Sequence, residues 1–238
     1  MSKVTGIILA AGDSARYGKS INKNFDKIDN RSVLNYSLEV FDKSDYIDDI
    51  VLVFKKEELK SVYEILSRSI LTKPMKMITG GKTRQESVFR GLTYTDSDYV
   101  VIHDGARPLI KEKYIEDCLS TMKEYDGCSV GVKASDTIKI TDEDGLVIDT
   151  TKRSNTWIVQ TPQCFNRKVL LDCHKKHLCD TDNTDDCMLL EKDGYKVKMI
   201  EGDRSNIKIT TQDDLWIAKD YVSKNNKTGI KVYKKDLF

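Results

Sequence analysis

The sequence predicts an α/β protein with a mostly parallel β-sheet that is covered by helices on both faces. Short β-branched runs alternate with segments of helical periodicity over most of the chain. Small and polar residues follow several of these runs, as expected where parallel strands end at a binding edge. The 238 residues suit one domain, expected over 1–224, with a polar, lysine-rich tail at 225–238.

The first unit of the pattern is a strand, a loop and a helix. Val4 to Leu9 is rich in β-branched residues, and apolar residues return at helical spacing between Val33 and Phe41. The same order then recurs. It predicts strands at 50–54, 75–78, 99–102 and 128–132 and helices at 57–66, 84–92 and 113–125.

The alternation stops at about 136–156, where two strand-like runs flank Asp142-Glu-Asp-Gly145. This pattern predicts a β-hairpin. Because its alternating sides are too polar for a core strand, we expect an arm that projects and packs on a second subunit; the alternative is an ordinary surface hairpin. The following pattern predicts a strand at 157–160, helices at 168–177 and 185–192, a strand at 196–200 and a last helix capped by Thr211.

Charge and composition exclude several classes of protein. Lys and Arg number 39 against 38 Asp and Glu, a formal net charge of +1, which argues against a nucleic-acid or membrane partner. No apolar run reaches the roughly 18 residues of a spanning helix. The amino-terminal segment also lacks the pattern of a secretory signal, which predicts a cytoplasmic protein. The six cysteines follow no framework spacing and are interpreted as thiols.

The loop after the first strand imitates two nucleotide-binding motifs. Gly12 and Gly18-Lys19-Ser20 enclose five residues where a P-loop requires four, and the extra residue moves the lysine off the phosphates. A dinucleotide fingerprint fails because Ser14 stands at its second glycine and no acid ends the second strand.

Two further motifs are set aside on geometric grounds. Cys173-His174, His177 and Cys179 are potential zinc ligands, but the four side chains do not converge from one helix. No Gly-x-Ser-x-Gly elbow occurs, so a covalent hydrolase has little support.

Four segments at predicted strand ends or loops remain, and together they offer the cations Arg16, Lys23, Arg107 and Lys208 and the carboxylate Asp104. Small residues for close backbone approach, cations for phosphates and an acid for a hard divalent metal are what a triphosphate site requires. The segments are Ala10-Ala-Gly-Asp-Ser-Ala-Arg16 with Lys23, Gly80-Gly-Lys-Thr-Arg-Gln-Glu-Ser87, His103-Asp-Gly-Ala-Arg-Pro108 and Asn206-Ile-Lys-Ile-Thr210.

These segments resemble the 2-C-methyl-D-erythritol 4-phosphate cytidylyltransferases of the non-mevalonate isoprenoid pathway, which have a Rossmann-like fold. The resemblance covers about residues 3 to 222. Its other motifs are Asp136-Thr137, Arg153-Ser-x-x-Trp157, Gln160-Thr-Pro-Gln163, Thr184-Asp185 and Glu201-Gly202.

The resemblance implies a role for each matching position. The positions that hold cytosine and ribose are matched by Ala10, Ala11, Gly12, Gly80, Gly81 and Ser87, and Asp104 with Gly105 matches the position near Mg²⁺ and ribose. The cations on the triphosphate of the co-substrate CTP are Arg16 and Lys23. The sugar-phosphate site is matched by Arg107, Thr137, Thr184 and Lys208, and Arg153 matches an arginine that reaches into the neighbouring subunit of a homodimer.

The implied reaction is attack of the substrate phosphate on the α-phosphorus of CTP, with pyrophosphate as leaving group. The second pKa of a phosphomonoester is near 6, so the nucleophile is already anionic and needs no general base. The difficulty is the approach of two anions, which fixed cations and a metal offset. Arg16, Lys23 and Lys208 are the expected catalytic cations.

The sequence departs from the family at several positions. Ser14 stands where a second glycine is usual, Tyr17 where methionine is usual, and Asn22-Lys23-Asn24 where Pro-Lys-Gln is usual; Lys152 replaces a common acid. Loss of the proline predicts a less rigid Lys23 segment. Two alternatives stay open: a ribitol-5-phosphate cytidylyltransferase, and a noncatalytic nucleotide-binding regulator.

Overall fold

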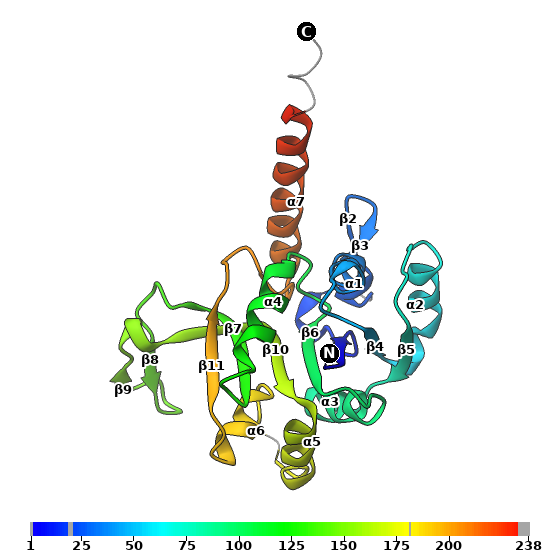
Figure 1. Cartoon of the computed structure of the whole chain (residues 1–238). Coiled ribbons are helices and arrows are strands. Elements are labelled where there is room, and N and C mark those ends of the chain that lie inside the picture. The colour runs from blue at the N-terminus through cyan, green and yellow to red at the C-terminus, as the bar shows by residue number, and fades with distance from the viewer. Residues whose placement is uncertain (1, 19–20, 181, 233–238) are drawn as a thin grey trace.

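The computed structural model describes residues 2–18, 21–180 and 182–232, with side chains up to residue 224 (Figure 1). Lys19, Ser20 and residues 233–238 of the expected tail lie outside the described residues. The main sheet has seven strands in the order β11-β7-β10-β6-β1-β4-β5. All neighbours are parallel except β10, which is antiparallel to both β6 and β7. The predicted α/β class is therefore confirmed.

The elements largely follow the periodicity of the sequence. The strands of the main sheet are β1 (Val4–Leu9), β4 (Asp49–Phe54), β5 (Met75–Thr79), β6 (Tyr99–Asp104), β7 (Gly127–Lys133), β10 (Trp157–Asn166) and β11 (Val197–Glu201). The helices are α1 (Val33–Lys43), α2 (Leu59–Leu66), α3 (Arg84–Thr93), α4 (Glu112–Thr121), α5 (Arg167–Lys176), α6 (Cys187–Lys192) and α7 (Gln212–Val232). Short 3₁₀ turns are η1 (Ala15–Tyr17), η2 (Lys23–Phe25), η3 (Lys56–Glu58) and η4 (Arg153–Asn155).

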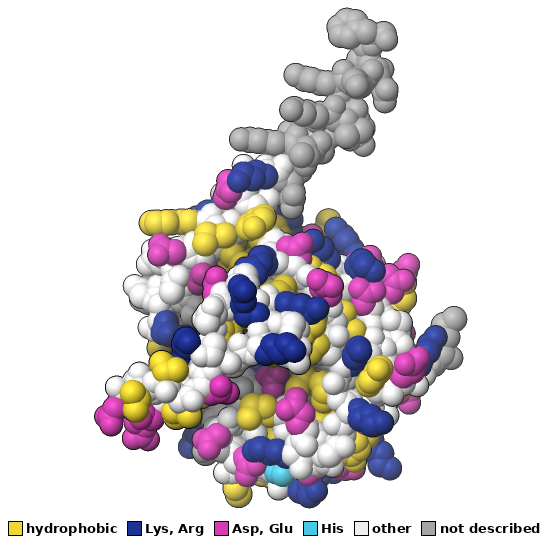
Figure 2. Space-filling view, turned by 90° about the vertical axis from the view of Figure 1, so that its left-hand side faces the viewer, with side chains coloured by type: hydrophobic (Ala, Val, Ile, Leu, Met, Phe, Trp, Pro, Cys, Tyr) yellow, Lys and Arg dark blue, Asp and Glu magenta, His cyan; other side chains and the backbone are white. Residues whose placement is uncertain are grey.

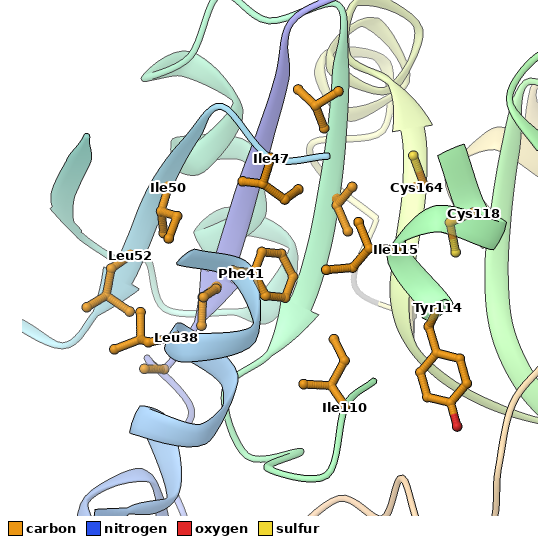
Figure 3. Close-up of a cluster of buried hydrophobic side chains, with 14 of the residues drawn as sticks. Leu38, Phe41, Ile47, Ile50, Leu52, Ile110, Tyr114, Ile115, Cys118 and Cys164 are labelled. Atoms are coloured by element: carbon orange, nitrogen blue, oxygen red, sulfur yellow. The ribbon is translucent and has the colours of Figure 1, made fainter. Parts of the chain in front are cut away.

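Helices cover both faces of the sheet because the apolar side chains of the strands point alternately to each side. Ile7 lies in the cluster that α3, α5 and α6 close, whereas its neighbour Ile8 lies in the cluster under α1, α2 and α4. In this second cluster Phe41 of α1 packs beside Ile47, Ile50 and Leu52 (Figure 3). Gly6 of β1 leaves the space that the Phe41 ring fills.

The largest difference from the predicted elements is β10. The sequence pattern predicted a strand that ends at residue 160. Instead the strand continues to Asn166 by a register shift between Val159 and Gln163. Helix α4 also ends at Thr121, short of the expected residue 125, and a small hairpin of β2 (Lys27–Ile28) and β3 (Arg31–Ser32) was not predicted.

The predicted hairpin at 136–156 is present as β8 (Lys139–Thr141) and β9 (Val147–Thr150), which pair antiparallel. It extends beyond β11 and forms no hydrogen-bonded part of the main sheet (Figure 1). Its apolar side chains Leu146 and Ile148 are 71% and 66% exposed. The arm therefore presents apolar surface away from the body of the chain.

Helix α7 begins as expected and continues beyond residue 224. The Asp214 backbone N–H donates to Thr211 Oγ1, while Asp214 Oδ2 accepts from the backbone N–H groups of Thr210 and Thr211, a reciprocal cap. The helix leads away from the body (Figure 1) and ends at Val232. None of the helices in the described part of the chain has the length and apolar character required to cross a bilayer.

The surface carries both charge signs, in agreement with the near-zero net charge. On one face, Lys and Arg side chains gather around a hollow below the base of α7, with acidic side chains near it (Figure 2). Any strong positive field is therefore local.

Candidate active site

A cavity of about 220 Å³ lies where β1, β5 and β6 end. Because these strands are parallel, the loops that follow them meet at one edge of the sheet. Lys208 reaches the same edge from the segment after β11, where the Ile209 N–H donates to Ala106 O at 2.8 Å. Seven of the sequence-predicted site residues line the cavity: Ala11, Gly12, Lys23, Gly81, Ser87, Asp104 and Lys208.

A second cavity, of about 400 Å³, lies beside β10 and the segment before α6. Its lining includes Arg107 and Thr184, the two residues that the sequence assigned to a sugar phosphate and that lie on separate loops. Three residues line both cavities: Arg84, Asp104 and Lys208. The two cavities therefore adjoin at one carboxylate and two cations.

Among the residues that the structure describes, Asp104 is the only carboxylate that lines both of these cavities, and it is surrounded by cations. Lys208 Nζ lies 2.8 Å from Asp104 Oδ2, and Arg84 Nε lies 3.7 Å from Asp104 Oδ1. Burial alone would raise the pKa of Asp104, but Lys208, Arg84 and Arg107 outweigh it and hold that pKa well below its usual range. Asp104 is therefore ionised throughout the physiological range.

Lys23 lies half-buried among like charges. Burial lowers its pKa, the neighbouring Lys208 and Arg16 lower it further, and Asp104 opposes them. A cation in this position is stabilised by any anion that enters the cavity. The arrangement suits the binding of a polyanion.

His103 precedes Asp104 but does not serve as a base. Its Nε2 lies 3.1 Å from Arg107 O and its Nδ1 lies 3.0 Å from Thr161 Oγ1, so the Nε2-protonated tautomer satisfies both nitrogens. Burial lowers the pKa of His103 to about 4, which keeps the ring neutral. Its role is to hold the loop that carries Arg107.

Three predicted glycine and alanine positions shape the site without lining a cavity. A Cβ at Gly80 would lie 2.6 Å from Ala11 Cβ and 2.8 Å from Ser87 Oγ, so only glycine allows this approach. A Cβ at Gly105 would lie 2.9 Å from Leu34 Cδ1. Ala10 is fully buried.

Three other predicted residues are not brought to the cavities within one chain. Arg16 is exposed on η1 and acts on the site through its effect on the Lys23 pKa. Thr137 and Arg153 are exposed at the base of the arm, where Arg153 Nη1 donates to Ser135 O. Their assigned roles remain predictions.

The principal residue to which sequence reasoning assigned no role is Arg84, although it lies within the Gly80-Gly motif. Arg84 Nη1 donates to Asp186 Oδ2 at 2.7 Å, and Asp186 Oδ1 lies 3.1 Å from His174 Nε2. Asp186 and His174 are almost completely buried. Together they fix the guanidinium that faces Asp104.

Zinc and Mg²⁺ make different demands on the protein's side chains. Among the described residues, no group of three or more His, Cys, Asp or Glu side chains is arranged to hold a metal ion. Mg²⁺ requires less, since it keeps several waters and binds through one or two carboxylates plus substrate phosphates. Asp104 lines both cavities and is held ionised, so it could supply the one carboxylate that such an ion requires.

A larger cavity, of about 630 Å³, lies between α1, α4 and α7. Each of its cations is paired with an acid, because Arg31 and Lys43 both pair with Glu39 and Lys111 pairs with Asp203. It therefore lacks the free positive charge that phosphates require.

Comparison with known proteins finds relatives that match almost the whole chain. A sequence model of the family described as "IspD: 2-C-methyl-D-erythritol 4-phosphate cytidylyltransferase" matches residues 4–224. Relatives described as 2-C-methyl-D-erythritol 4-phosphate cytidylyltransferase include one from Clostridium novyi, 45% identical over 90% of this chain and 94% of the relative. Another, from Caldanaerobacter subterraneus subsp. tengcongensis, is 41% identical over 93% of this chain and 99% of the relative.

Solved structures show the same similarity. The crystal structure of 4-diphosphocytidyl-2C-methyl-D-erythritol synthase from Anaerococcus prevotii has a TM-score of 0.83 and 31% identity, covering 93% of this chain and 96% of that one. The Francisella tularensis 2-C-methyl-D-erythritol 4-phosphate cytidylyltransferase has a TM-score of 0.76 and 29% identity, covering 91% and 98%.

Proposed function

The chain belongs to the 2-C-methyl-D-erythritol 4-phosphate cytidylyltransferase family, and from this premise we propose which residues bind each substrate and which act in catalysis. The activity itself is that of a CTP-dependent nucleotidyltransferase acting on 2-C-methyl-D-erythritol 4-phosphate, so the ribitol phosphate and regulator alternatives are not retained. In our proposal CTP occupies the 220 Å³ cavity and the polyol phosphate the 400 Å³ cavity. The observation that carries the proposal is that Arg84, Asp104 and Lys208 line both.

The nucleotide cavity recognises cytidine through backbone and small residues. Gly80 packs closely against Ala11 and Ser87, which line this cavity, and we propose that their backbone groups select a pyrimidine over a purine. Lys23 and Arg16 then bind the triphosphate, with Lys23 in the cavity wall and the exposed Arg16 near enough to lower the Lys23 pKa. Phosphate charge compensates the like-charge repulsion that lowers the Lys23 pKa.

The polyol phosphate is held by Arg107 and Thr184 in the second cavity. Its phosphate oxygen attacks the α-phosphorus, the bond to the bridging oxygen breaks, and pyrophosphate leaves. Because the phosphomonoester is anionic at neutral pH, no proton need be removed, in keeping with the neutral, fully bonded His103. Lys208, at the boundary, neutralises charge on both reacting groups.

We also propose Asp104 as the residue that holds the divalent cation, with oxygens of the triphosphate and water as the other ligands. When bound, the metal supplies charge neutralisation at the phosphates. Lys208 and Arg84 hold the Asp104 carboxylate at the boundary of the two cavities.

The oligomer belongs to the same proposal. The arm exposes Leu146 and Ile148, and an apolar surface of this kind is stabilised by burial against a second copy. In that arrangement Arg153, at the base of the arm, reaches the polyol phosphate in the partner's cavity. Thr137, also at the base, contributes to a sugar-phosphate site.

The proposal is tested by pyrophosphate release with CTP and 2-C-methyl-D-erythritol 4-phosphate. Lys208→Ala should lower kcat/KM by about a hundredfold or more, because a cation at the reacting phosphates is lost. Lys176→Ala is the matched control, since Lys176 pairs with Asp193 outside both cavities. Near-normal turnover of Lys208→Ala would refute the assignment, as would equal losses in the two variants.

A further inference from the structure

The backbone of the loop that carries Lys23 adopts the conformation of a glycine at position 14 and of a proline at position 22. Ser14 has φ 53°, in the left-handed region that favours glycine. Asn22 has φ −64°, the value to which proline is restricted. These are the two positions at which the sequence departs from the usual glycine and proline.

The two departures are in direct contact. Ser14 Oγ donates to Asn22 Oδ1 at 3.0 Å and accepts from the Lys23 backbone N–H at 3.3 Å. Asn22 Oδ1 also accepts from the Asn24 backbone N–H at 3.0 Å. The side chains of Ser14 and Asn22 thus close a small hydrogen-bonded ring around the backbone of Lys23.

Asn22 also fastens this ring to the rest of the site. Its Nδ2 donates to Glu58 Oε1 at 2.8 Å and to Gly12 O at 3.2 Å, and the residue is only 8% exposed. Asn24 Nδ2 donates to Ala10 O at 3.1 Å. Both asparagines that flank Lys23 therefore bind the backbone of the first loop, while the Lys23 side chain lines the cavity.

A constraint of this kind has a physical purpose. Lys23 lies near Lys208 and Arg16, and their charges, together with burial, lower its pKa. Without an anion in the cavity, this repulsion favours movement of the Lys23 loop away from the site. If hydrogen bonds already fix the loop before CTP binds, no free energy is needed to move Lys23 back toward the site during the reaction.

We propose that Asn22 and Ser14 are positioning residues for Lys23, and that the hydrogen bonds from Ser14 to Asn22 and from Asn22 to Glu58 replace the rigidity that a proline at position 22 would give. The proposal rests on the role of Lys23 in the proposed function. It also changes the expectation from sequence, because loss of the proline is offset by a different constraint.

The test is a double-mutant cycle with kcat and KM for CTP as readouts. Asn22→Ala should lower kcat by about tenfold to a hundredfold with a smaller change in KM, because a misplaced lysine mainly weakens transition-state contacts. In the Lys23→Ala background the same substitution should change kcat less than twofold, because no lysine is left to position. Asn166→Ala, which removes a helix-capping side chain at the opposite edge of the sheet, is the matched control and should leave kcat unchanged.

A rescue variant separates positioning from folding. Ser14→Gly/Asn22→Pro should restore kcat to within about threefold of the parent, since both backbone conformations already suit these residues. Equal kcat losses from Asn22→Ala with and without Lys23, or a fully active Asn22→Ala, would overturn the proposal. A fully active Lys23→Ala would instead refute the role of Lys23 in the proposed function. If Asn22→Ala does not fold, Glu58→Ala enters the same cycle with the same criteria.

Discussion

Lys208 Nζ lies 2.8 Å from Asp104 Oδ2, and both residues line both cavities of the site. The pair joins the end of β6 to a segment about a hundred residues later in the chain. It places the lysine proposed to neutralise the reacting phosphates against the carboxylate proposed to hold the metal. Its charge balance therefore bears on stability as well as on activity.

Asp104→Asn should destabilise the protein and inactivate it. The substitution leaves Lys208, Arg84 and Arg107 without their shared counter-charge, which should cost about 3 kcal/mol of unfolding free energy. Urea denaturation measures the first effect and pyrophosphate release the second. The exposed Asp96, paired with Lys3, provides the control Asp96→Asn, for which a change below about 1 kcal/mol is expected. An Asp104→Asn protein as stable as its parent would contradict this account of the site.

His103 should make the protein sensitive to mild acid. Its folded pKa of about 4 lies below the unfolded value of 6.5, so between these values the unfolded chain binds more protons. The stability that neutral His103 provides is complete above pH 6.5 and is lost as pH falls to 4, a loss of about 3 kcal/mol. His103→Gln, which keeps a donor for Arg107 O, should flatten this part of the curve of unfolding free energy against pH. The same substitution should leave the dependence of kcat on pH between 6.5 and 8 unchanged. If an ionisation seen in the parent profile disappears from the profile of His103→Gln, His103 acts as a general base.

Gly80→Ala should weaken CTP binding. The new methyl group would lie within 3 Å of Ala11 Cβ and Ser87 Oγ, so the wall of the nucleotide cavity must shift. An increase in KM for CTP of about tenfold is expected, measured by pyrophosphate release. The control is Gly194→Ala: Gly194 has φ +80° and open space around it, so alanine should cost about 1 kcal/mol of stability through backbone strain without changing KM. Equal KM values for Gly80→Ala and the parent would show that the close approach is not needed.

Arg153→Ala should be inactive alone and recover activity in a mixed dimer. If Arg153 acts in the partner's cavity, a dimer of one Lys23→Ala and one Arg153→Ala subunit contains one intact site. Refolding the two variants together in equal amounts should then restore about a quarter of the parent activity, because half the dimers are mixed and each has one working site. No recovery from a mixture that contains dimers would place the function of Arg153 within its own chain.

Much of the site could be predicted because its residues directly follow strands. Asp104 ends β6 and Gly80 follows β5, and parallel strands bring their carboxyl ends to one edge. Lys208 was singled out as a cation in a predicted loop, and only its role came from family resemblance, whereas Thr184 was assigned from that resemblance alone. The structure places both at the cavities, whereas Thr137 and Arg153 remain on the arm.

Other features could not be predicted from local sequence. Arg84 and Asp186 are in contact although they lie 102 residues apart in the chain. The hydrophobic periodicity of a sequence does not indicate which buried carboxylate an arginine will pair with. The hydrogen bonds of Ser14 and Asn22 could not be predicted for a related reason. Taken alone, Ser14 is a less favourable residue than the usual glycine, and Asn22 is less favourable than the usual proline. Only their contact shows that they compensate each other.

The sequence by itself determined the layered fold, because a strand that alternates its apolar side chains between two faces must be covered on both. It also determined the chemical inventory, a set of cations with one acid at strand ends. The tertiary structure decided which of these charges lie close together, that the pKa of Lys23 is lowered, and which hydrogen-bonded side chains hold the loops. Those properties depend on distance and burial between residues far apart in the chain, because Coulomb energy and desolvation follow spatial separation rather than sequence order.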